Sequence, residues 1–340
     1  MGRGNKAYYK DLHQQAYDRL TAMLSLGESK KEAVANGTGK DKIFSVSTYK
    51  SYWKHIKYFL GYIKLKHPEC TTLKSAKKYV NEWLQSRTEQ NLSAWTVQLE
   101  AKALGKLYGI DPDDENYYKP PKRNREDITR SRSDCVRDRH FSKTNNDALI
   151  KFCCGTGLRR RELGGLRGKD LVQREQIAAE AEQLEHIPQA ERAPSVTKRL
   201  EMLRDALIFP QEYFVHVRNG KGGRERLSPV IGKNAAQIVE RIADTPAEEK
   251  VWQHIHSCAD IHAYRGEYAT AIYKAYARPI EEIPYDRVNK GTGRRFQSGV
   301  YTCRKDEAGK KLDKAAMLVC SKALGHNRIC VVADNYIRGL

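Results

Sequence analysis

The sequence lacks the features of a membrane protein or a secreted protein. No apolar run approaches the ~18 residues that span a bilayer, and no apolar segment follows the charged N-terminus, as a secretory signal requires. The eight cysteines include no CxxC pair, and a chain of this size does not depend on a disulfide framework. These absences predict a cytoplasmic protein with reduced thiols.

Acidic residues are also in short supply. Asp and Glu number 42 against 61 Lys and Arg, which gives the 340-residue chain a formal net charge of +19. A polyanion is the simplest partner for this surplus, and nucleic acid is the commonest polyanion. A basic surface that only aids solubility is the alternative. The length is sufficient for two or three domains, each with its own core.

Helical periodicity dominates the first third of the sequence. Apolar residues recur at helical spacing in four stretches, 12–24, 49–63, 75–85 and 93–108. Gly27 is placed to end the first helix, and 30–42 is typical of a loop. Capping oxygens for the second helix are offered by Ser45, Ser47 and Thr48. We expect a helical extension over 1–43 and a helical bundle over 44–118. Its exposed lysines either face solvent or bind DNA; they include Lys50, Lys54 and Lys57.

A basic linker is expected over 119–140. Pro120 and Pro121 favour an extended chain there. The neighbouring cations include Lys122, Arg123 and Arg125. The segment either follows a phosphate backbone or is a solvated tether.

From residue 141 the pattern changes to mixed α and β. It predicts a short helix over 145–154, exposed helix over 171–207, and a β-hairpin formed by 214–217 and 226–230.

One candidate site residue lies in the segment Thr156-Gly157-Leu158-Arg159-Arg160-Arg161-Glu162-Leu163, where a glycine turn precedes a helix start. Such a start leaves backbone N–H groups beside Arg159, where an anion binds well. Glu162 lies over the same helix face and is placed to hold the Arg159 guanidinium. An ordinary turn with exposed arginines is the alternative.

The expected hairpin tip, Gly220-Lys221-Gly222-Gly223, presents a lysine on a backbone that can approach a ligand closely. It is not a P-loop, because a strand follows it in place of a helix.

Two histidine motifs complete the candidates. His262 and Arg265 share one helix face at i, i+3 spacing, where both could reach a phosphate. A zinc cluster is the alternative there, although no second half-site follows it; its ligands would be His254, His256, Cys258 and His262. In the segment Leu324-Gly325-His326 a glycine ends one helix, and the next helix presents Tyr336. The alternative for Tyr336 is partial burial against the surface.

Together these residues have a chemical meaning that none has alone. Two arginines and two histidines can bracket a phosphodiester, and a lysine can deliver a proton. A tyrosine can then attack phosphorus, provided that fixed cations stabilise the developing charge.

In these motifs and in their order along the chain, the sequence resembles the tyrosine recombinases, or phage-type integrases, of bacterial mobile elements. The resemblance implies a helical core-binding domain over 44–118 and a mixed α/β catalytic domain over 141–340 with a small antiparallel hairpin or sheet. The two would form a C-shaped clamp around duplex DNA.

The resemblance also implies a role for each candidate. Tyr336 would attack the scissile phosphate and form a 3′-phosphotyrosyl bond, while Arg159 and Arg265 stabilise the added charge. Lys221 would protonate the leaving 5′-hydroxyl, and Glu162 would orient Arg159. His262 would assist proton movement at the nucleophile, and His326 would donate a hydrogen bond to the phosphate.

The implied chemistry uses neither metal nor ATP, and its implied partner is a specific site on double-stranded DNA. The family acts as a homotetramer in the synaptic complex and as a monomer or dimer otherwise. An excisionase or a host DNA-bending factor is a further implied partner.

Two departures from the family pattern concern length. The spacings from Arg159 to Lys221 and from Arg265 to His326 are longer than usual, so we assign insertions to 172–207 and 279–312. The second insertion brings further cations, and we expect Arg294, Arg295 and the hairpin residue Arg224 to touch DNA. Few residues follow Tyr336, so contacts between protomers are expected to come from elsewhere.

Three alternatives stay open. They are a type IB topoisomerase that rejoins the same strand, a non-catalytic DNA-binding relative, and a zinc-dependent protein.

Overall fold

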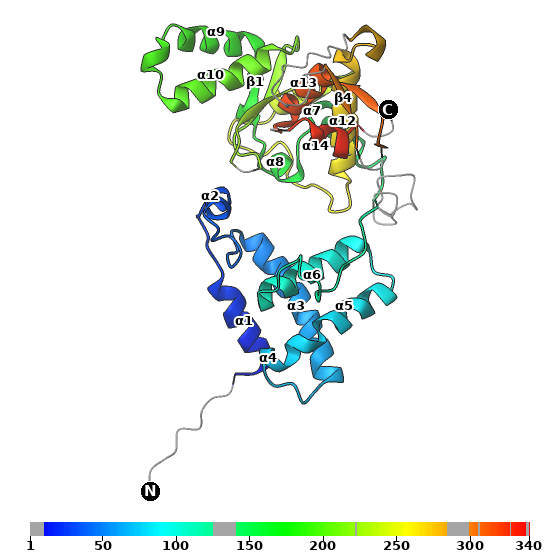
Figure 1. Cartoon of the computed structure of the whole chain (residues 1–340). Helices are drawn as coiled ribbons and strands as arrows, with labels where there is room; N and C mark the ends of the chain where they lie inside the picture. Colours follow the sequence, from blue (N-terminus) through cyan, green and yellow to red (C-terminus); the bar gives the residue numbers. More distant parts are fainter. Residues whose placement is uncertain are drawn as a thin grey trace. The chain divides into compact units, whose positions relative to one another are not determined.

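The structure is a computed structural model that describes residues 10–124, 141–221, 223–283, 299–304, 307–326, 328–337 and 340. It divides into two compact units, Met1–Thr129 and Arg130–Leu340 (Figure 1). The described residues are mostly helical, with two small antiparallel sheets. None of their helices combines the length and the apolar character needed to cross a membrane. Arg125, Arg294 and Arg295, which we expected to touch DNA, lie outside the described residues.

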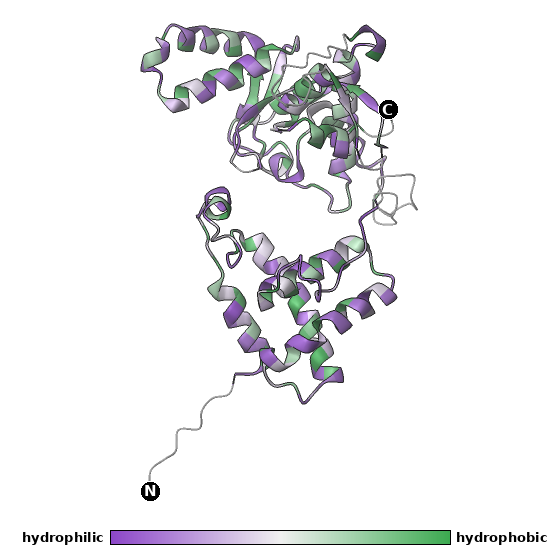
Figure 2. Cartoon of the chain, in the orientation of Figure 1, coloured by the Kyte–Doolittle hydropathy of each residue, from purple (hydrophilic) through white to green (hydrophobic). Residues whose placement is uncertain are grey.

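The described part of the N-terminal unit is a helical bundle. Its helices are α1 (Leu12–Ala22), α2 (Lys30–Ala35), α3 (Val46–Lys66), α4 (Leu73–Ala76), α5 (Val80–Glu89) and α6 (Ala94–Tyr108). Hydrophilic and hydrophobic residues alternate along these helices (Figure 2), and apolar residues of α1, α3, α4, α5 and α6 form one core. Ser45 caps α3 as predicted, because its hydroxyl accepts a hydrogen bond from the backbone N–H of Thr48.

Three local predictions in this unit are wrong. The first helix ends at Ala22, so Gly27 lies beyond it in a later turn. The expected loop over 30–42 contains α2, because Ser29 supplies an N-cap oxygen to it. The helix expected over 75–85 is divided, since a 3₁₀ turn over Lys77–Tyr79 separates α4 from α5.

The C-terminal unit contains both sheets. In the three-stranded sheet, β2 (Tyr213–Val217) pairs with β1 (Leu171–Gln173) on one side and with β3 (Arg226–Pro229) on the other. The β2–β3 hairpin is therefore confirmed. The second sheet pairs β4 (Val300–Thr302) with β5 (Lys311–Asp313).

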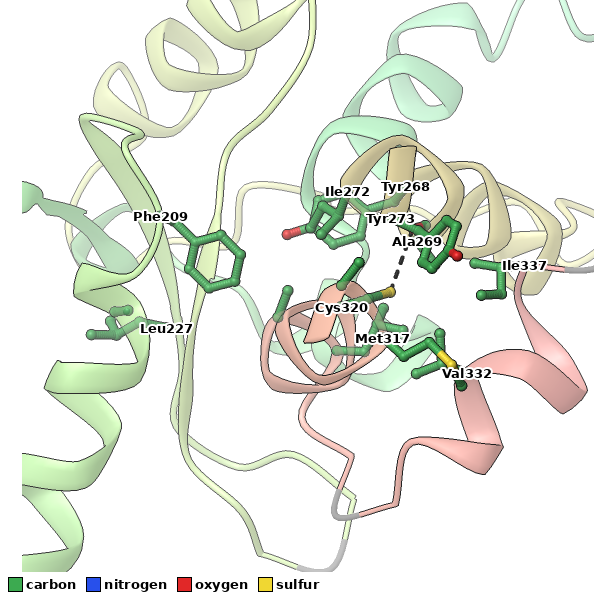
Figure 3. Close-up of a cluster of buried hydrophobic side chains, with 14 of the residues drawn as sticks. Phe209, Leu227, Tyr268, Ala269, Ile272, Tyr273, Met317, Cys320, Val332 and Ile337 are labelled. Carbon is green, nitrogen blue, oxygen red and sulfur yellow. Dashed lines mark hydrogen bonds between the residues drawn. The ribbon is translucent and has the colours of Figure 1, made fainter. Parts of the chain in front are cut away.

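Helices surround these sheets and supply most of the unit's core. They are α7 (Asp147–Thr156), α8 (Arg160–Gly165), α11 (Ala235–Ala243), α12 (Ile261–Tyr276), α13 (Lys314–Leu324) and α14 (Cys330–Asn335), with short 3₁₀ turns at Gly168–Asp170, Gln189–Glu191 and Ile280–Glu282. Figure 3 shows α12, α13 and α14 meeting through buried side chains such as Tyr268, Met317 and Val332. Because α13 and α14 carry the last sequence motifs, this packing fixes those motifs against α12.

The segment 171–207 differs from the exposed helix that we predicted. It begins with β1 and continues as two helices packed side by side, α9 (Arg174–Glu185) and α10 (Pro194–Leu207), drawn in green in Figure 1. One face of each helix is buried, and the buried residues are Ile177, Ala181, Leu200, Leu203 and Ala206. Their i, i+4 and i, i+3 spacings are typical of an amphipathic helix, so this segment shares the core of the unit.

Candidate active site

A tight turn between α7 and α8 positions Arg159. Gly157 has a left-handed backbone (φ +60°), and a Cβ atom there would overlap the ring of Tyr268, so this position requires glycine. Arg159 is the N-cap of α8, and its Nη1 donates to Glu162 Oε1 at 2.7 Å, which is the contact that the spacing predicted. Its backbone N–H, which we expected to be available to an anion, donates to Glu162 Oε2 at 2.9 Å.

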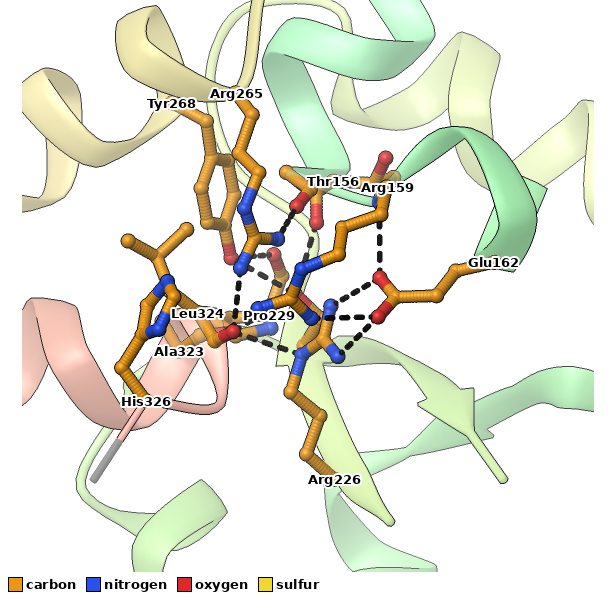
Figure 4. Close-up of polar contacts among 12 residues, drawn as sticks. Thr156, Arg159, Glu162, Arg226, Pro229, Arg265, Tyr268, Ala323, Leu324 and His326 are labelled. Atoms are coloured by element: carbon orange, nitrogen blue, oxygen red, sulfur yellow. Dashed lines mark hydrogen bonds and ion pairs between the residues drawn. The ribbon is translucent and has the colours of Figure 1, made fainter. Parts of the chain in front are cut away.

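Sequence reasoning missed Arg226, which is the second partner of Glu162. Its Nη1 and Nη2 donate to the two carboxylate oxygens of Glu162 at 3.1 and 2.7 Å, and its Nε donates to the Ala323 carbonyl oxygen at 3.2 Å (Figure 4). Arg226 lies on β3, where all four residues are buried. A charged residue in a buried strand must be paired, but its charged neighbours in the sequence made it resemble an exposed residue.

The two arginines keep Glu162 ionised. Burial alone would raise the pKa of this carboxyl, but the hydrogen bonds and charges of Arg226 and Arg159 lower the pKa to about 2. Glu162 is therefore a fixed negative charge that orients both guanidinium groups.

Arg265 on α12 is fixed mainly by the main chain. It is 1% exposed, and its Nη1 and Nη2 donate to the carbonyl oxygens of Gly157 and Leu324. Its Nε donates to the hydroxyl of Tyr336 at 3.3 Å. Burial lowers the pKa of Arg265 to about 10, so this group stays charged at neutral pH.

The Tyr336 hydroxyl lies between Arg265 and His326. Tyr336 is the C-cap of α14, and its Oη is 3.3 Å from Arg265 Nε and 3.3 Å from His326 Nε2. A guanidinium can only donate, so Oη accepts the bond from Arg265. The hydroxyl proton is then free to point at His326 Nε2, which accepts it in the neutral tautomer protonated at Nδ1.

The two histidines contact Tyr336 differently. The His262 ring stacks on the phenol ring in a nearly parallel orientation, with centroids 5.0 Å apart and an interplanar angle of 7°. The His326 ring is tilted by 45° and approaches the hydroxyl. His326 follows Gly325, the left-handed cap of α13, where a Cβ atom would come within 2.8 Å of Arg226 Cδ.

His326 is neutral at physiological pH. Burial lowers the pKa of its imidazole to about 3, and the surrounding positive charges add to this effect. Those charges are Arg265, Arg159, Arg226 and Lys221. A neutral imidazole beside a phenol can accept a hydrogen bond from it, and a phosphate anion bound among these cations would raise the pKa of the imidazole and so its strength as a base.

Lys221 lies at the exposed tip of the β2–β3 hairpin. The backbone N–H of Gly220 donates to the Arg224 carbonyl oxygen at 2.8 Å, and a Cβ atom on Gly220 would lie 2.6 Å from that oxygen. This glycine is therefore needed to close the tip. Lys221 is near enough to the other residues for its charge to lower the pKa of His326.

The expected DNA contacts lie elsewhere in the described residues. Lys50, Lys54 and Lys57 are exposed on α3 of the N-terminal unit. Exposed Lys122 and Arg123 follow that unit's last helix, and the Arg123 guanidinium carbon is 5.7 Å from the Trp95 ring centroid. Arg224 is exposed beside the hairpin tip. The expected catalytic side chains thus belong to the C-terminal unit, whereas most of these cations belong to the N-terminal unit.

The zinc alternative has no ligand set in the described structure. Within the described ranges, no group of three or more His, Cys, Asp or Glu side chains could hold a metal ion. His254 and His256 have ring centroids 6.4 Å apart. His256 Nδ1 accepts a bond from the backbone N–H of Cys258, and His262 stacks on Tyr336.

Comparison with known proteins gives little more. No protein-family model matches the chain, and no curated protein matches it. Among solved structures, the chain is similar to one titled "Crystal structure of XerA recombinase", with 14% sequence identity and a TM-score of 0.27. The match covers 95% of this chain and 94% of that one. A TM-score this low does not establish a shared fold, so the side-chain chemistry must carry a functional assignment.

Proposed function

We propose that this protein is a tyrosine recombinase, which cuts and rejoins duplex DNA at specific sites through a 3′-phosphotyrosyl intermediate. The integration or excision of a mobile element is its proposed role. One observation carries the proposal: the Tyr336 hydroxyl lies 3.3 Å from both a buried guanidinium and a neutral imidazole. This arrangement activates a phenol as a nucleophile and stabilises the charge that it develops.

The proposed reaction exchanges one phosphodiester for another. Tyr336 Oη attacks phosphorus, the bond from phosphorus to the 5′-oxygen breaks, and the tyrosyl ester forms. Arg159 and Arg265 stabilise the negative charge on the non-bridging oxygens, and Lys221 gives a proton to the departing 5′-oxygen. A 5′-hydroxyl from another strand then attacks the tyrosyl phosphate and reverses the step. The bond energy is conserved in the ester, so these steps require no ATP.

The geometry favours one change to the roles that the resemblance implied. His326 approaches the Tyr336 hydroxyl, whereas His262 lies over the ring. We therefore assign the transfer of the Tyr336 proton to His326. His262 supports the phenol ring in its position.

DNA binding is the remaining part of the proposal. The +19 net charge and the exposed lysines of α3 support binding to a phosphate backbone. We propose that the two units close on the duplex as a C-shaped clamp and that four copies assemble at the recombination site.

A nicked suicide duplex, drawn from the DNA that flanks this gene, tests the proposal. The wild type should form a denaturant-resistant protein–DNA adduct in EDTA, and Tyr336→Phe should form none. Tyr301→Phe removes another hydroxyl from the same unit and should leave the adduct unchanged. An adduct that persists in Tyr336→Phe contradicts the proposal.

Two further results would favour the alternatives. Salt-sensitive binding without any adduct, across a randomised DNA pool, favours a non-catalytic DNA-binding protein. Rejoining of the cut strand without transfer to a second duplex favours a topoisomerase.

A further inference from the structure

The hairpin tip presents a positioning problem. A general acid must lie within about 2.6–3.2 Å of the atom that it protonates, yet Lys221 is exposed at the tip of the β2–β3 hairpin, beyond the end of β1, which pairs only with residues 213–215 of β2. A hairpin that extends past its neighbouring strand needs packing against other elements to hold its tip in place. The position of Lys221 therefore depends on contacts at the base of the tip.

The two residues at the start of β3, Glu225 just before it and Arg226 within it, contact different groups. Arg226 points inward and binds Glu162 beside Arg159. Glu225 contacts a different set of residues. Its Oε1 is 2.5 Å from Nε2 of His216 on β2 and 3.1 Å from Nη1 of Arg199 on α10.

The hydrogen bonds at Glu225 have defined donors, which are His216 and Arg199. A carboxylate accepts but cannot donate, so His216 Nε2 carries the hydrogen. His216 is buried, and burial lowers its pKa, so it donates as a neutral ring. Arg199 supplies the positive charge. It is itself held by Glu180 of α9 through two hydrogen bonds of 2.7 Å.

Apolar packing supports the same connection. Leu200 and Leu203 of α10 belong to one buried cluster with Leu227 of β3. A further ion pair joins α10 to α13, since Lys322 Nζ lies 2.6 Å from Asp205 Oδ1. The α9–α10 pair therefore does not extend freely from the unit.

We propose that the α9–α10 pair is a brace that positions Lys221, with Arg199 acting through Glu225. The brace rests on the proposed function, because it matters only if Lys221 protonates a leaving group. It gives the segment between β1 and β2 a role in the reaction. Arg199 is a positioning residue, since it contacts Glu225 and does not itself touch the substrate.

The chain offers a matched control on the same helix. Arg204 of α10 pairs with Glu185 of α9, and its Nε lies 2.8 Å from Oε1. That pair joins the two helices without touching the hairpin. Arg199→Ala and Arg204→Ala thus each remove one pair between α9 and α10, and only the first also removes the contact from α10 to Glu225.

The first measurement is amide hydrogen exchange on the full-length protein without DNA. We expect amides at 218–221 and 223–225 to exchange several-fold faster in Arg199→Ala than in the wild type. Arg204→Ala should match the wild type there. Glu225→Gln keeps an acceptor for His216 but loses the charge that attracts Arg199, so it should behave like Arg199→Ala. Equal exchange in both arginine variants would overturn the brace.

The second measurement asks whether Lys221 is the residue affected. It compares adduct formation on two suicide duplexes. One carries the normal scissile 5′-oxygen, and in the other this oxygen is replaced by sulfur. Attack by Tyr336 then breaks a P–S bond, and the sulfur leaves as a thiolate. Because thiols have a pKa of about 8.5, this leaving group needs no general acid.

On the oxygen substrate we expect Lys221→Ala to slow adduct formation by about 10²–10³ and Arg199→Ala by roughly tenfold. On the sulfur substrate both variants should approach the wild-type rate, and Arg204→Ala should match the wild type on both. A defect of Arg199→Ala that persists on the sulfur substrate would overturn the inference, because that defect could not come from impaired protonation of the leaving group by Lys221. A wild type that forms no adduct on either substrate would contradict the proposed function itself.

Discussion

The buried and the exposed halves of the candidate site hold their charges in different ways. Arg265 is 1% exposed and donates to two main-chain carbonyls and the Tyr336 hydroxyl. Lys221 is exposed, and the nearest anchors of its hairpin are the ion pairs of Glu225 and Arg226. Charge beside Tyr336 is therefore fixed within the protein itself, whereas charge at Lys221, the proposed general acid, depends on surface contacts. Substitutions and changes of solvent should affect the two halves unequally.

The largest effect is expected at the buried cation. Arg265→Ala removes the donor nearest the Tyr336 hydroxyl and should slow adduct formation by about 10³, at the upper end for a single fixed donor. Arg265→Lys should recover little of this rate, since an ammonium cannot reproduce the planar fork. Single-turnover adduct formation measures both variants, and Arg204→Ala, at an exposed arginine of the same unit, is the control. If Arg265→Lys forms the adduct at nearly the wild-type rate, the planar guanidinium is not needed to place the positive charge beside Tyr336.

Acid should weaken the buried network next. The folded pKa of Glu162 is about 2, against an ordinary value near 4.5. The stability that this carboxylate provides is present above pH ~4.5 and is lost as the pH falls towards 2, by up to ~3 kcal/mol. Denaturant unfolding between pH 7 and pH 3 should show a shallower loss in Glu162→Gln.

Glu248→Gln is the control for that experiment. Glu248 pairs with Lys169 and Arg167 on the surface, where such pairs contribute little. Its substitution should leave the acid dependence almost unchanged, and an equal flattening in both variants would show that burial of Glu162 is not the cause.

The two histidines should differ by a smaller factor. His326→Gln removes the acceptor of the Tyr336 proton and should slow adduct formation by at least about 10². His262→Phe keeps an aromatic ring for stacking and should lose much less. The pKa of His326 near 3 predicts that the wild-type rate shows no titration of this group between pH 6 and pH 8. A larger loss in His262→Phe than in His326→Gln would reverse the assignment.

The smallest expected effect is a difference in how amide exchange in the two halves of the site responds to salt. Arg199 and Glu225 are partly exposed, and such pairs contribute about 0–1 kcal/mol and are screened by salt. Raising the salt from 0.1 to about 0.5 M should speed amide exchange at the hairpin tip by less than about fivefold. Exchange within α12 around Arg265 should not respond. If salt speeds amide exchange equally at the hairpin tip and in α12, the two halves of the site do not differ in how their charges are held.

Sequence reasoning anticipated the side chains whose positions depend on local spacing. The Arg159–Glu162 contact follows from the i, i+3 spacing, and Gly325 ends α13 as predicted. The helix predicted over 145–154 instead runs from Asp147 to Thr156, where Gly157 caps it. The hairpin followed from two strand-like runs around a glycine-rich tip. The catalytic roles of these residues stay predictions that await the adduct experiment.

Tertiary contacts were beyond the reach of the sequence. Arg226 pairs with Glu162 from a distant strand, and Arg265 binds carbonyl groups that every residue possesses, so no side-chain pattern marks them. The burial of α9 and α10 is different. Ile177 and Ala181 stand at i, i+4, and Leu200 and Leu203 stand at i, i+3, but numerous charged neighbours obscured this apolar face.

The partners of Arg265 bear on how the sequence can change over evolutionary time. Two of its acceptors are main-chain oxygens, and a point mutation cannot delete a main-chain carbonyl. Leu324 can therefore drift among residues that keep the end of α13 in place, with the charge at the tyrosine preserved. Arg159 and Arg226 instead share the one carboxylate of Glu162, and a single codon change there releases both. Tolerance to substitution of a partner residue is thus greater for Arg265, the cation that contacts Tyr336, than for Arg159 and Arg226.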